Sequence, residues 1–323
     1  KESSLGGVVK NVIPGFRISD EAIQKDVDLV LKMGAEVCCG APAPSVSELK
    51  AQGFTHIYFA VGAWKAGKLN IPGNVAPVIG WMQDLKAGKE VSLGHVAVVG
   101  GGNTAMDAAR VALRAGAKSS TLIYRRTKKY MPADAEELEL AIADGVRFLE
   151  LVSPVEQKNG TLLCRKMKLG EPDASGRRTP EETGETVEIN CDTVVSAVGE
   201  QVDTQLLTDN GIALNSVGCP SFITNVEGVY CGGDTRRGPA TVVECIADAQ
   251  GFANQVLKSF PVVEFPENAR SSREEAVAKR GILCESAKCE GERCLTCNVV
   301  CENCADVCPN RANVAIQLPG GSY

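Results

Sequence analysis

The stretch that decides the fold of this chain is His95-Val-Ala-Val-Val-Gly-Gly-Gly-Asn-Thr-Ala-Met-Asp-Ala-Ala-Arg-Val-Ala-Leu-Arg-Ala-Gly116. Residues 96–99 form a short apolar run, which is typical of a strand buried on both faces of a parallel sheet. Three glycines follow, and the alanine-rich segment after them is an expected helix that ends at the final glycine. Gly100, Gly102 and Ala105 fit the pattern G-x-G-x-x-G/A of dinucleotide-binding folds.

Each position of this turn has a physical role in binding a dinucleotide. Gly100 permits a tight turn, and Gly102 lacks a Cβ atom, so a pyrophosphate can approach the backbone. Ala105 is small enough for the helix to pack closely on the strand. The free N–H groups at the start of the helix then face the phosphates. The alternative is an ordinary glycine-rich loop, but the strand before the turn and the helix after it favour a bound dinucleotide.

The residues after the next expected strand, residues 121–124, indicate which dinucleotide binds. An NAD site usually has Asp or Glu at this point, to bind the ribose hydroxyls. This chain has Arg125 and Arg126 there, followed by Lys128 and Lys129. Guanidinium groups suit a 2′-phosphate through charge-assisted hydrogen bonds, so we expect NADPH rather than NADH. The alternative is that these cations form only a solvated turn.

Composition narrows the class of protein further. The chain has 323 residues, enough for two or three domains, and 44% of them are apolar, as in ordinary globular proteins. No run approaches the 18 or more apolar residues of a membrane helix. The net charge of −6 argues against a nucleic-acid partner. No secretory signal is apparent at the start, so we expect a cytoplasmic protein; because the chain does not begin with Met, we also expect it to be part of a longer one.

Seven of the 14 cysteines fall between residues 284 and 308, next to a dinucleotide fold, which favours a metal or cluster site over disulfides. The end of this segment matches the latter part of the bacterial ferredoxin pattern, C-x2-C-x3-C-P. The regular pattern would place the remaining cysteine at position 298, which is Asn298. We therefore expect one [4Fe-4S] cluster, with zinc as the alternative. The expected ligands are Cys297, Cys301, Cys304 and Cys308, with Cys294 able to replace Cys297.

Two similar strands bracket the nucleotide turn. Residues 56–62 and 191–199 are apolar, and both end in Ala-Val-Gly, at Gly62 and Gly199. This repetition predicts two related dinucleotide domains, one inserted in the other. A third strand, residues 228–234, runs into Gly-Gly-Asp before a long helix that reaches Val256. Asp234 can accept hydrogen bonds from ribitol or ribose hydroxyls, and the helix dipole can favour electron density on a flavin; a plain strand–turn–helix is the alternative.

Several further local expectations can be tested against the structure. Residues 5–18 suggest a glycine-bearing loop, and the cap signals after it predict a helix that begins near Ser19. Residues 161–169 and 185–190 resemble a hairpin. Cys38 and Cys39 are expected to be buried or incidental rather than redox-active, and His56 is expected to be structural rather than a catalytic base.

The chain is similar to the β (small) subunit of glutamate synthase and its relatives, and within them it resembles most the large selenate reductase-type oxidoreductases that carry iron–sulfur motifs. The resemblance covers about residues 1–258, and the cysteine-rich tail also fits the selenate reductase-type relatives. The segments that match are Leu5-Gly-Gly with Ile13-Pro-Gly-Phe-Arg17, Gly100-Gly-Gly-Asn-Thr-Ala-Met-Asp107, Tyr124-Arg-Arg-Thr with Met131-Pro-Ala133, and Gly232-Gly-Asp234 with Gly238-Pro-Ala-Thr241.

This resemblance implies an α/β fold of two nested dinucleotide-binding domains, like those of glutathione and thioredoxin reductases, followed by a ferredoxin-like cysteine-rich tail. The implied parts are a partial FAD domain (1–90), an NADPH domain (91–200), the return of the FAD domain (201–260), and a linker with the iron–sulfur segment (261–323). The implied NADPH residues are Gly100, Gly102, Asn103, Thr104, Ala105, Arg125, Arg126 and Gly199. The implied flavin residues are Gly6, Gly7, Arg17, Gly62, Gly233, Asp234, Ala240 and Thr241. The first flavin motif of the family should precede Leu5, so we expect the flavin domain to lack its N-terminal unit here and its FAD site to be incomplete.

The function expected from these features is electron transfer from NADPH through FAD and the [4Fe-4S] cluster to a partner subunit or domain. No catalytic side chain is required, because the cofactors carry the chemistry. An FAD-dependent disulfide reductase is one alternative, but the only cysteines between residues 91 and 200 are Cys164 and Cys191, too far apart in sequence for C-x-x-C. A scaffold that binds nucleotide and cluster without catalysis is another. The sequence does not identify the terminal electron acceptor.

Overall fold

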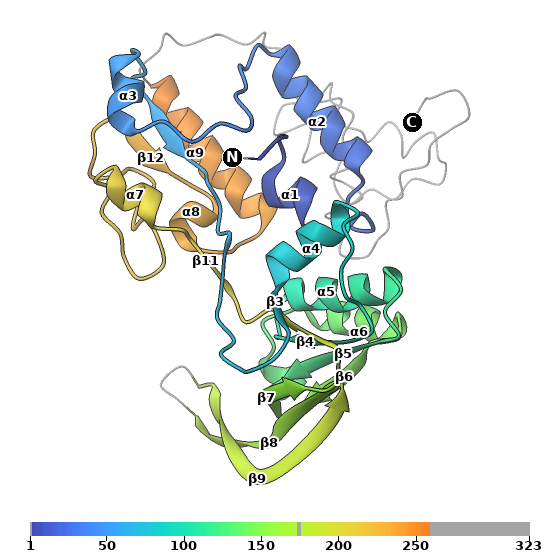
Figure 1. Cartoon of the computed structure of the whole chain (residues 1–323). Coiled ribbons are helices and arrows are strands. Elements are labelled where there is room, and N and C mark those ends of the chain that lie inside the picture. The colour runs from blue at the N-terminus through green and yellow to red at the C-terminus, as the bar shows by residue number, and fades with distance from the viewer. Residues whose placement is uncertain (1, 173–175, 259–323) are drawn as a thin grey trace, which may run out of the picture. The chain divides into compact units, whose positions relative to one another are not determined.

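The computed structural model describes residues 2–172 and 176–258. The nucleotide turn follows the central strand of a parallel sheet of five strands (Figure 1). Within this part of the chain, the residues up to Val256 belong to one compact unit. The strand order is β3-β10-β4-β5-β6, so β4, which precedes the glycines, lies in the centre. The strands are β3 (Val75–Pro77), β10 (Thr193–Ser196), β4 (His95–Val99), β5 (Ser119–Tyr124) and β6 (Arg147–Glu150).

One face of this sheet is covered by helices whose small side chains allow close packing. In α5 (Asn103–Arg114), the methyl groups of Ala105, Ala108, Ala109 and Ala112 are completely buried. They pack with Val96 and Val98 of β4, among other residues of one continuous core. The helices whose buried side chains form this core are α4 (Val78–Lys86), α5 and α6 (Ala135–Ala143).

The other face is covered by an antiparallel sheet of three strands, which Figure 1 shows on the side away from α5. Leu162 and Cys164 of this small sheet pack against Ala97 and Ile123 of the parallel sheet. The predicted hairpin is confirmed and is longer than expected, since its two strands extend as far as Pro172 and Arg178. The three strands are β7 (Val152–Lys158), β8 (Thr161–Pro172) and β9 (Arg178–Asn190).

A second part of the fold is formed by chain segments that precede and follow the parallel-sheet unit in sequence. Ile57–Phe59 (β1) pairs in parallel with Val229–Cys231 (β12), with Ile57 opposite Val229. The whole nucleotide unit lies between these two paired strands in sequence, which confirms the predicted nesting. The chain passes between the two parts through β2 (Lys65–Ala66) and β11 (Glu200–Gln201), which pair with each other in antiparallel fashion.

The second part has its own apolar core, which includes Phe59, Leu207 and Val229. The remaining α-helices of the described chain precede or follow the nucleotide part in sequence: α1 (Gly7–Asn11), α2 (Asp20–Lys32), α3 (Val46–Ala51), α7 (Gln205–Asp209), α8 (Asp234–Arg237) and α9 (Val242–Leu257). A single turn of 3-10 helix, η1 (Lys128–Tyr130), belongs to the nucleotide part. None of the helices in the described ranges has the length and apolar character needed to cross a membrane.

The helix starts show where local sequence was informative and where it was not. Ser19 caps α2 by accepting a hydrogen bond from the Ala22 N–H at 3.1 Å, as its cap signals predicted. The expectation of a loop over residues 5–18 is wrong in part, because α1 occupies Gly7–Asn11. A helix of five residues is too short to show apolar periodicity. It forms here because it packs against other helices, with Val8 and Val12 joining the core beneath α4.

Candidate functional site

A cavity of about 910 Å³ opens at the carboxyl ends of β4, β5 and β10. Ligands of open α/β sheets bind at this edge, since the loops after parallel strands meet there. The cavity brings together residues that are far apart in sequence. The sequence-predicted residues among those that line it are Gly100, Gly102, Asn103, Thr104, Arg125, Arg126, Gly199, Ala240 and Thr241.

The three glycines of the turn have different surroundings, which test whether a dinucleotide would fit. A Cβ atom at Gly100 would lie 2.3 Å from the Ala197 carbonyl oxygen, and one at Gly101 would lie 2.5 Å from the Tyr124 ring. A Cβ atom at Gly102 would meet nothing within 4 Å. Gly100 and Gly101 are therefore required by the fold itself, whereas Gly102 faces the open cavity, where a pyrophosphate would approach.

The helix after the turn would supply the donors for a pyrophosphate. Asn103 and Thr104 occupy the first two positions of α5, where backbone N–H groups have no carbonyl partner one turn earlier. The positive end of the helix dipole favours an anion at this point. Ala105 is fully buried and does not line the cavity, in keeping with the predicted role of a small residue beneath the turn.

One end of the cavity is cationic. Arg125 and Arg126 follow β5, as predicted, and Arg177, the residue before the hairpin strand β9, also lines the cavity. The Arg126 Nε donates to the Arg178 carbonyl oxygen at 3.0 Å, so the hairpin holds this guanidinium in place. The sequence offered no signal for Arg177, because its place beside Arg126 depends on the way the hairpin folds back over the sheet.

The other end of the cavity lies beyond β10, on the opposite side of β4 from the arginines. Gly199 is found here, with Ala240 and Thr241 from the second part of the fold. Residues expected to bind NADPH and residues expected to bind flavin thus share one cavity wall. Glu200 also lines this end, and sequence reasoning did not identify it. Burial raises the pKa of the Glu200 carboxyl.

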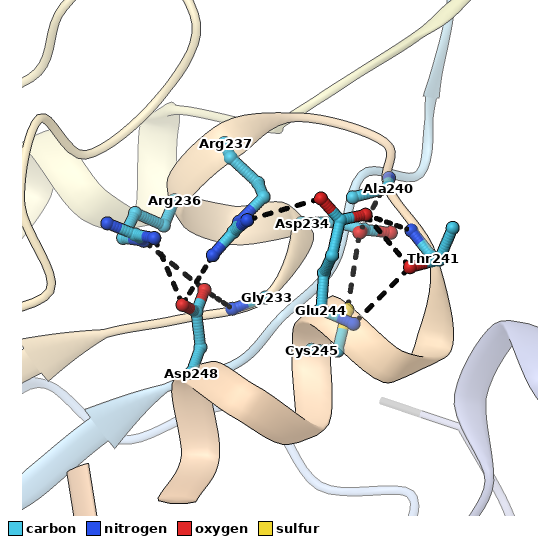
Figure 2. Close-up of polar contacts among 9 residues, drawn as sticks. All are labelled: Gly233, Asp234, Arg236, Arg237, Ala240, Thr241, Glu244, Cys245 and Asp248. Carbon is cyan, nitrogen blue, oxygen red and sulfur yellow. Dashed lines mark hydrogen bonds and ion pairs between the residues drawn. The ribbon is translucent and has the colours of Figure 1, made fainter. Parts of the chain in front are cut away.

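The turn around α8 carries most of the remaining flavin candidates, and Figure 2 shows its polar contacts. The Ala240 N–H donates to the Asp234 carboxylate at 3.0 Å, and the Cys245 thiol lies 3.5 Å from the same oxygen. Burial raises the pKa of Asp234. The Gly233 N–H donates to Asp248 at 2.9 Å. Asp234 therefore helps to shape the loop that leads to Thr241, and its remaining acceptor capacity is available to a ligand hydroxyl.

Two arginines complete the network in Figure 2. Arg236 and Arg237 both donate to Asp248, at 3.0 and 2.5 Å, and Arg237 also pairs with Glu244. The Thr241 N–H donates to Glu244 at 2.9 Å, which caps the start of α9. These pairs link α8 to α9 and hold Ala240 and Thr241 at the cavity wall.

The other flavin candidates lie in separate places in the fold. The Gly62 N–H donates to the Thr235 hydroxyl at 3.0 Å, which joins the end of β1 to α8. Gly6 is the N-cap of α1, where its φ of 108° suits glycine, and Gly7 is the first residue of that helix. Arg17 follows α1 and donates to Asp107 at 2.7 Å and to Glu137 at 2.6 Å. Arg17 thus joins this segment to the nucleotide part.

The described cysteines are not arranged as a metal site. No group of three or more His, Cys, Asp or Glu side chains in residues 2–172 and 176–258 could hold a metal ion. The predicted cluster ligands Cys294, Cys297, Cys301, Cys304 and Cys308 lie outside the described residues. Cys38 and Cys39 are exposed, so of the two possibilities expected for them, burial is wrong and an incidental position is left. His56 stacks on Tyr230 with ring centroids 6.1 Å apart, which suits the structural role predicted for it.

Comparisons with known proteins agree with this geometry. Residues 19–249 match the family described as pyridine nucleotide-disulphide oxidoreductase. The chain is 39% identical over 351 residues to a protein of Escherichia coli (strain K12) named "Putative oxidoreductase YgfK", covering 99% of this chain and 33% of that protein. It is 31% identical over 282 residues to "Putative glutamate synthase (NADPH) small chain" of Cereibacter sphaeroides, covering 78% of this chain and 68% of the relative.

Among solved structures, the fold is similar to that of Mycobacterium tuberculosis FprA in complex with NADPH. The TM-score is 0.62 at 20% identity, over 83% of this chain and 80% of FprA. This similarity confirms the predicted α/β fold of nested dinucleotide-binding domains, and the family match confirms the predicted oxidoreductase class. The chain spans about a third of the length of YgfK.

Proposed function

The chain belongs to the pyridine nucleotide-disulphide oxidoreductase family, in the group of the glutamate synthase small chains, and we propose from this premise that it transfers electrons from NADPH to FAD. The observation that carries this proposal is the position of Gly102. Its open face lies between the arginines that follow β5 and the residues Ala240 and Thr241 at the other end of the same cavity. An extended dinucleotide laid across Gly102 would place its adenosine at one end and its nicotinamide at the other.

The residues of the cavity have separate tasks in this proposal. Gly102 and the first turn of α5 hold the pyrophosphate. Arg125 and Arg126 bind the 2′-phosphate by charge-assisted hydrogen bonds. The hydrogen bond to the Arg178 carbonyl oxygen holds the Arg126 guanidinium in place before the ligand binds. Ala240 and Thr241 hold the flavin next to the nicotinamide, with Asp234 shaping their loop. When bound, the two cofactors supply the hydride chemistry, and the protein aligns them and excludes water.

The rest of the proposal extends the assignment to the whole chain. Residues 91–200 bind NADPH, residues 1–90 and 201–260 contribute to the FAD site, and residues 261–323 hold a [4Fe-4S] cluster. Electrons then pass from FAD through the cluster to a partner subunit or domain. Support comes from the spacing of Cys301, Cys304 and Cys308 before a proline, and from the name of a relative as a small chain.

The nucleotide half of the proposal is tested by titrating the protein with 2′,5′-ADP and with 5′-AMP, two ligands that differ by the 2′-phosphate. We expect 2′,5′-ADP to bind more tightly. The double variant Arg125→Ala/Arg126→Ala should weaken its binding by about 10- to 100-fold, the effect of losing hydrogen bonds to a charged group, and should leave 5′-AMP nearly unchanged. Equal affinity of the wild-type protein for both ligands would overturn the NADPH assignment.

The electron-transfer half needs a separate measurement. NADPH is added anaerobically to the FAD-loaded protein, and reduction is followed by the loss of flavin absorbance. We expect NADPH to reduce the flavin with a larger kcat/KM than NADH. If NADP⁺ binds normally but NADPH never reduces the flavin, the chain is a nucleotide-binding scaffold. Zinc in place of iron in the purified protein would remove the cluster from the proposal.

A further inference from the structure

Glu200 is a half-buried carboxylate at the end of the cavity that the arginines do not reach. It directly follows Gly199, and it is the first residue of β11, the strand through which the chain returns to the second part of the fold. Its side chain lines the cavity, yet its Oε1 atom is buried and has no hydrogen-bond partner within the described part of the protein. A buried carboxylate oxygen without a donor is unfavourable, so the site gains from a ligand that supplies one.

The other contacts of Glu200 fix the direction in which this oxygen can act. Burial raises the pKa of this carboxyl, and the nearby Thr104 side chain, at the second position of α5, offsets part of that rise. The carboxylate therefore lies beside the start of α5, the helix end that a pyrophosphate would meet. The negative charge of Asp234 from α8 also acts on Glu200 and, together with burial, raises its pKa. Glu200 therefore lies where the nucleotide turn approaches the loop that leads to Ala240 and Thr241.

The chemistry of the carboxylate selects the part of NADPH that can meet it. An ionised carboxylate only accepts hydrogen bonds, and the phosphates of NADPH are also acceptors, so the two would repel each other. The adenine and its ribose belong at the opposite end, beside Arg125 and Arg126. The donors left in the molecule are the carboxamide N–H groups and the ribose hydroxyls of the nicotinamide half.

We propose that Glu200 is a positioning residue that accepts a hydrogen bond from the nicotinamide riboside half of NADPH and orients the nicotinamide beside Ala240 and Thr241. This inference rests on the proposed function. The order of the strands supports it, because β4 lies between β10 and β5. A dinucleotide that crosses the glycine turn from the arginines after β5 must continue toward the residues after β10, and Glu200 is the carboxylate found there.

A purely structural role for Glu200 makes a different prediction. If the carboxylate served only to hold β11 beside the start of α5, its removal would disturb the turn and weaken the binding of every ligand of the cavity alike. If it binds the nicotinamide riboside, its removal would weaken only ligands that carry that group. NADP⁺ and 2′,5′-ADP provide the comparison, since both carry the 2′-phosphate but only NADP⁺ carries nicotinamide.

The experiment is calorimetric titration of wild-type protein, Glu200→Ala and Glu200→Gln with both ligands. We expect Glu200→Ala to weaken NADP⁺ by about 10- to 100-fold, as for a hydrogen bond to a charged group, and to change 2′,5′-ADP by less than about twofold. Glu200→Gln keeps an acceptor oxygen and should weaken NADP⁺ binding less than Glu200→Ala does. Glu185→Ala is the matched control, because this exposed carboxylate on β9 pairs with Lys166 outside the cavity; neither ligand should be affected.

The remaining outcomes separate this inference from the proposed function. Equal loss of both ligands in Glu200→Ala, or no loss of either, overturns the role of Glu200 while leaving NADPH binding intact. If Glu200→Ala fails to fold in a thermal melt, Glu200→Gln decides, since unchanged affinity for NADP⁺ in a variant with a neutral side chain contradicts a charged acceptor. If the wild-type protein binds neither ligand, the proposed function fails and this inference with it.

Discussion

The Arg17 Nε atom donates to the Asp107 carboxylate at 2.7 Å, so the segment after α1 is fastened to the helix that begins at the nucleotide turn. The neighbouring ring of Phe16 strengthens the same contact. The guanidinium carbons of Arg110 and Arg114 on α5 lie 4.5 and 4.6 Å from its centroid. One short loop therefore uses an ion pair and an aromatic ring to fix the position of α5, on which the turn depends.

This contact predicts the effect of removing Arg17. Its side chain is 26% exposed, and the Asp107 and Glu137 side chains are only 15% and 17% exposed. Arg17→Ala should lower the free energy of unfolding by about 2 kcal/mol, because two partly buried carboxylates lose their charged donor. Urea denaturation at constant m-value measures this change. Lys89→Ala removes an exposed pair with Asp84 and should change stability by less than about 0.5 kcal/mol; equal effects of the two variants would contradict the prediction.

A pH dependence follows from the end of α6. Asp144 accepts hydrogen bonds from Arg110 at 2.8 Å and Arg114 at 2.9 Å, and these lower its pKa below the ordinary value of 3.8. Because the folded pKa is depressed, the stabilisation is complete above that ordinary value and is lost as the pH falls through the folded pKa. Asp144→Asn should cost about 1 kcal/mol near neutral pH, because water screens this partly exposed ion pair.

The measurement is the difference in free energy of unfolding between wild type and Asp144→Asn, taken by urea denaturation from about pH 6 down to about pH 3. We expect the difference to shrink toward low pH, where the wild-type carboxylate also becomes neutral. A difference that stays constant over this range would mean that the ion pairs of Asp144 do not contribute to stability.

The glycines of the turn offer a matched pair of variants. Gly102 has φ −96° and open space at its Cβ position, so Gly102→Ala should fold with unchanged stability or gain up to about 1 kcal/mol. The new methyl group would nevertheless stand where the pyrophosphate approaches, and NADP⁺ should bind at least about tenfold more weakly. Gly100→Ala should instead lose about 1–3 kcal/mol of stability, because its Cβ would clash with the Ala197 backbone. Thermal melts and calorimetric titration check both predictions. A Gly102→Ala variant that binds NADP⁺ normally would contradict a pyrophosphate site at Gly102.

The cysteines should differ sharply in reactivity. Cys38 and Cys39 are exposed, whereas burial raises the pKa of Cys164 to about 12 and that of Cys191 to about 11. At about pH 8, iodoacetamide should therefore alkylate the first two in the native protein and spare the second two, since the thiolate is the nucleophile. Peptide mapping by mass spectrometry gives the extent at each site. In urea all four should react, and native labelling of Cys164 at the rate of Cys38 would contradict the burial.

The part of the site that could be predicted from sequence is local. The strand, the glycine turn and the helix of residues 95–116 are neighbours in the chain, and each has its own pattern: an apolar run, glycines, then alanines at helical spacing. Arg125 and Arg126 were found by the same logic, because they follow the next strand directly. Short elements escaped it, as α1 shows, since five residues hold too little periodicity to identify a helix.

Other contacts had no local signal at all. The pairing of Arg17 with Asp107 joins residues 90 positions apart, and the place of Arg177 beside Arg126 depends on a long hairpin that folds back over the sheet. Nothing in the residues around Glu200 distinguishes it from a solvent-exposed glutamate of a connecting strand. Its orphaned oxygen appears only when β11, α5 and the α8 turn have come together.

The amino-acid sequence alone determined the strand, the glycine turn and the helix of residues 95–116 and the two arginines after the next strand, since backbone freedom, helix formation and strand burial are properties of adjacent residues. Tertiary structure decided which distant side chains share the cavity with that turn. In the folded chain β10 lies between β3 and β4, and β1 pairs with β12 although the whole nucleotide unit separates them in sequence. Such strand pairings follow from the packing of entire surfaces against each other, and a short stretch of sequence does not specify the distant surface against which it packs.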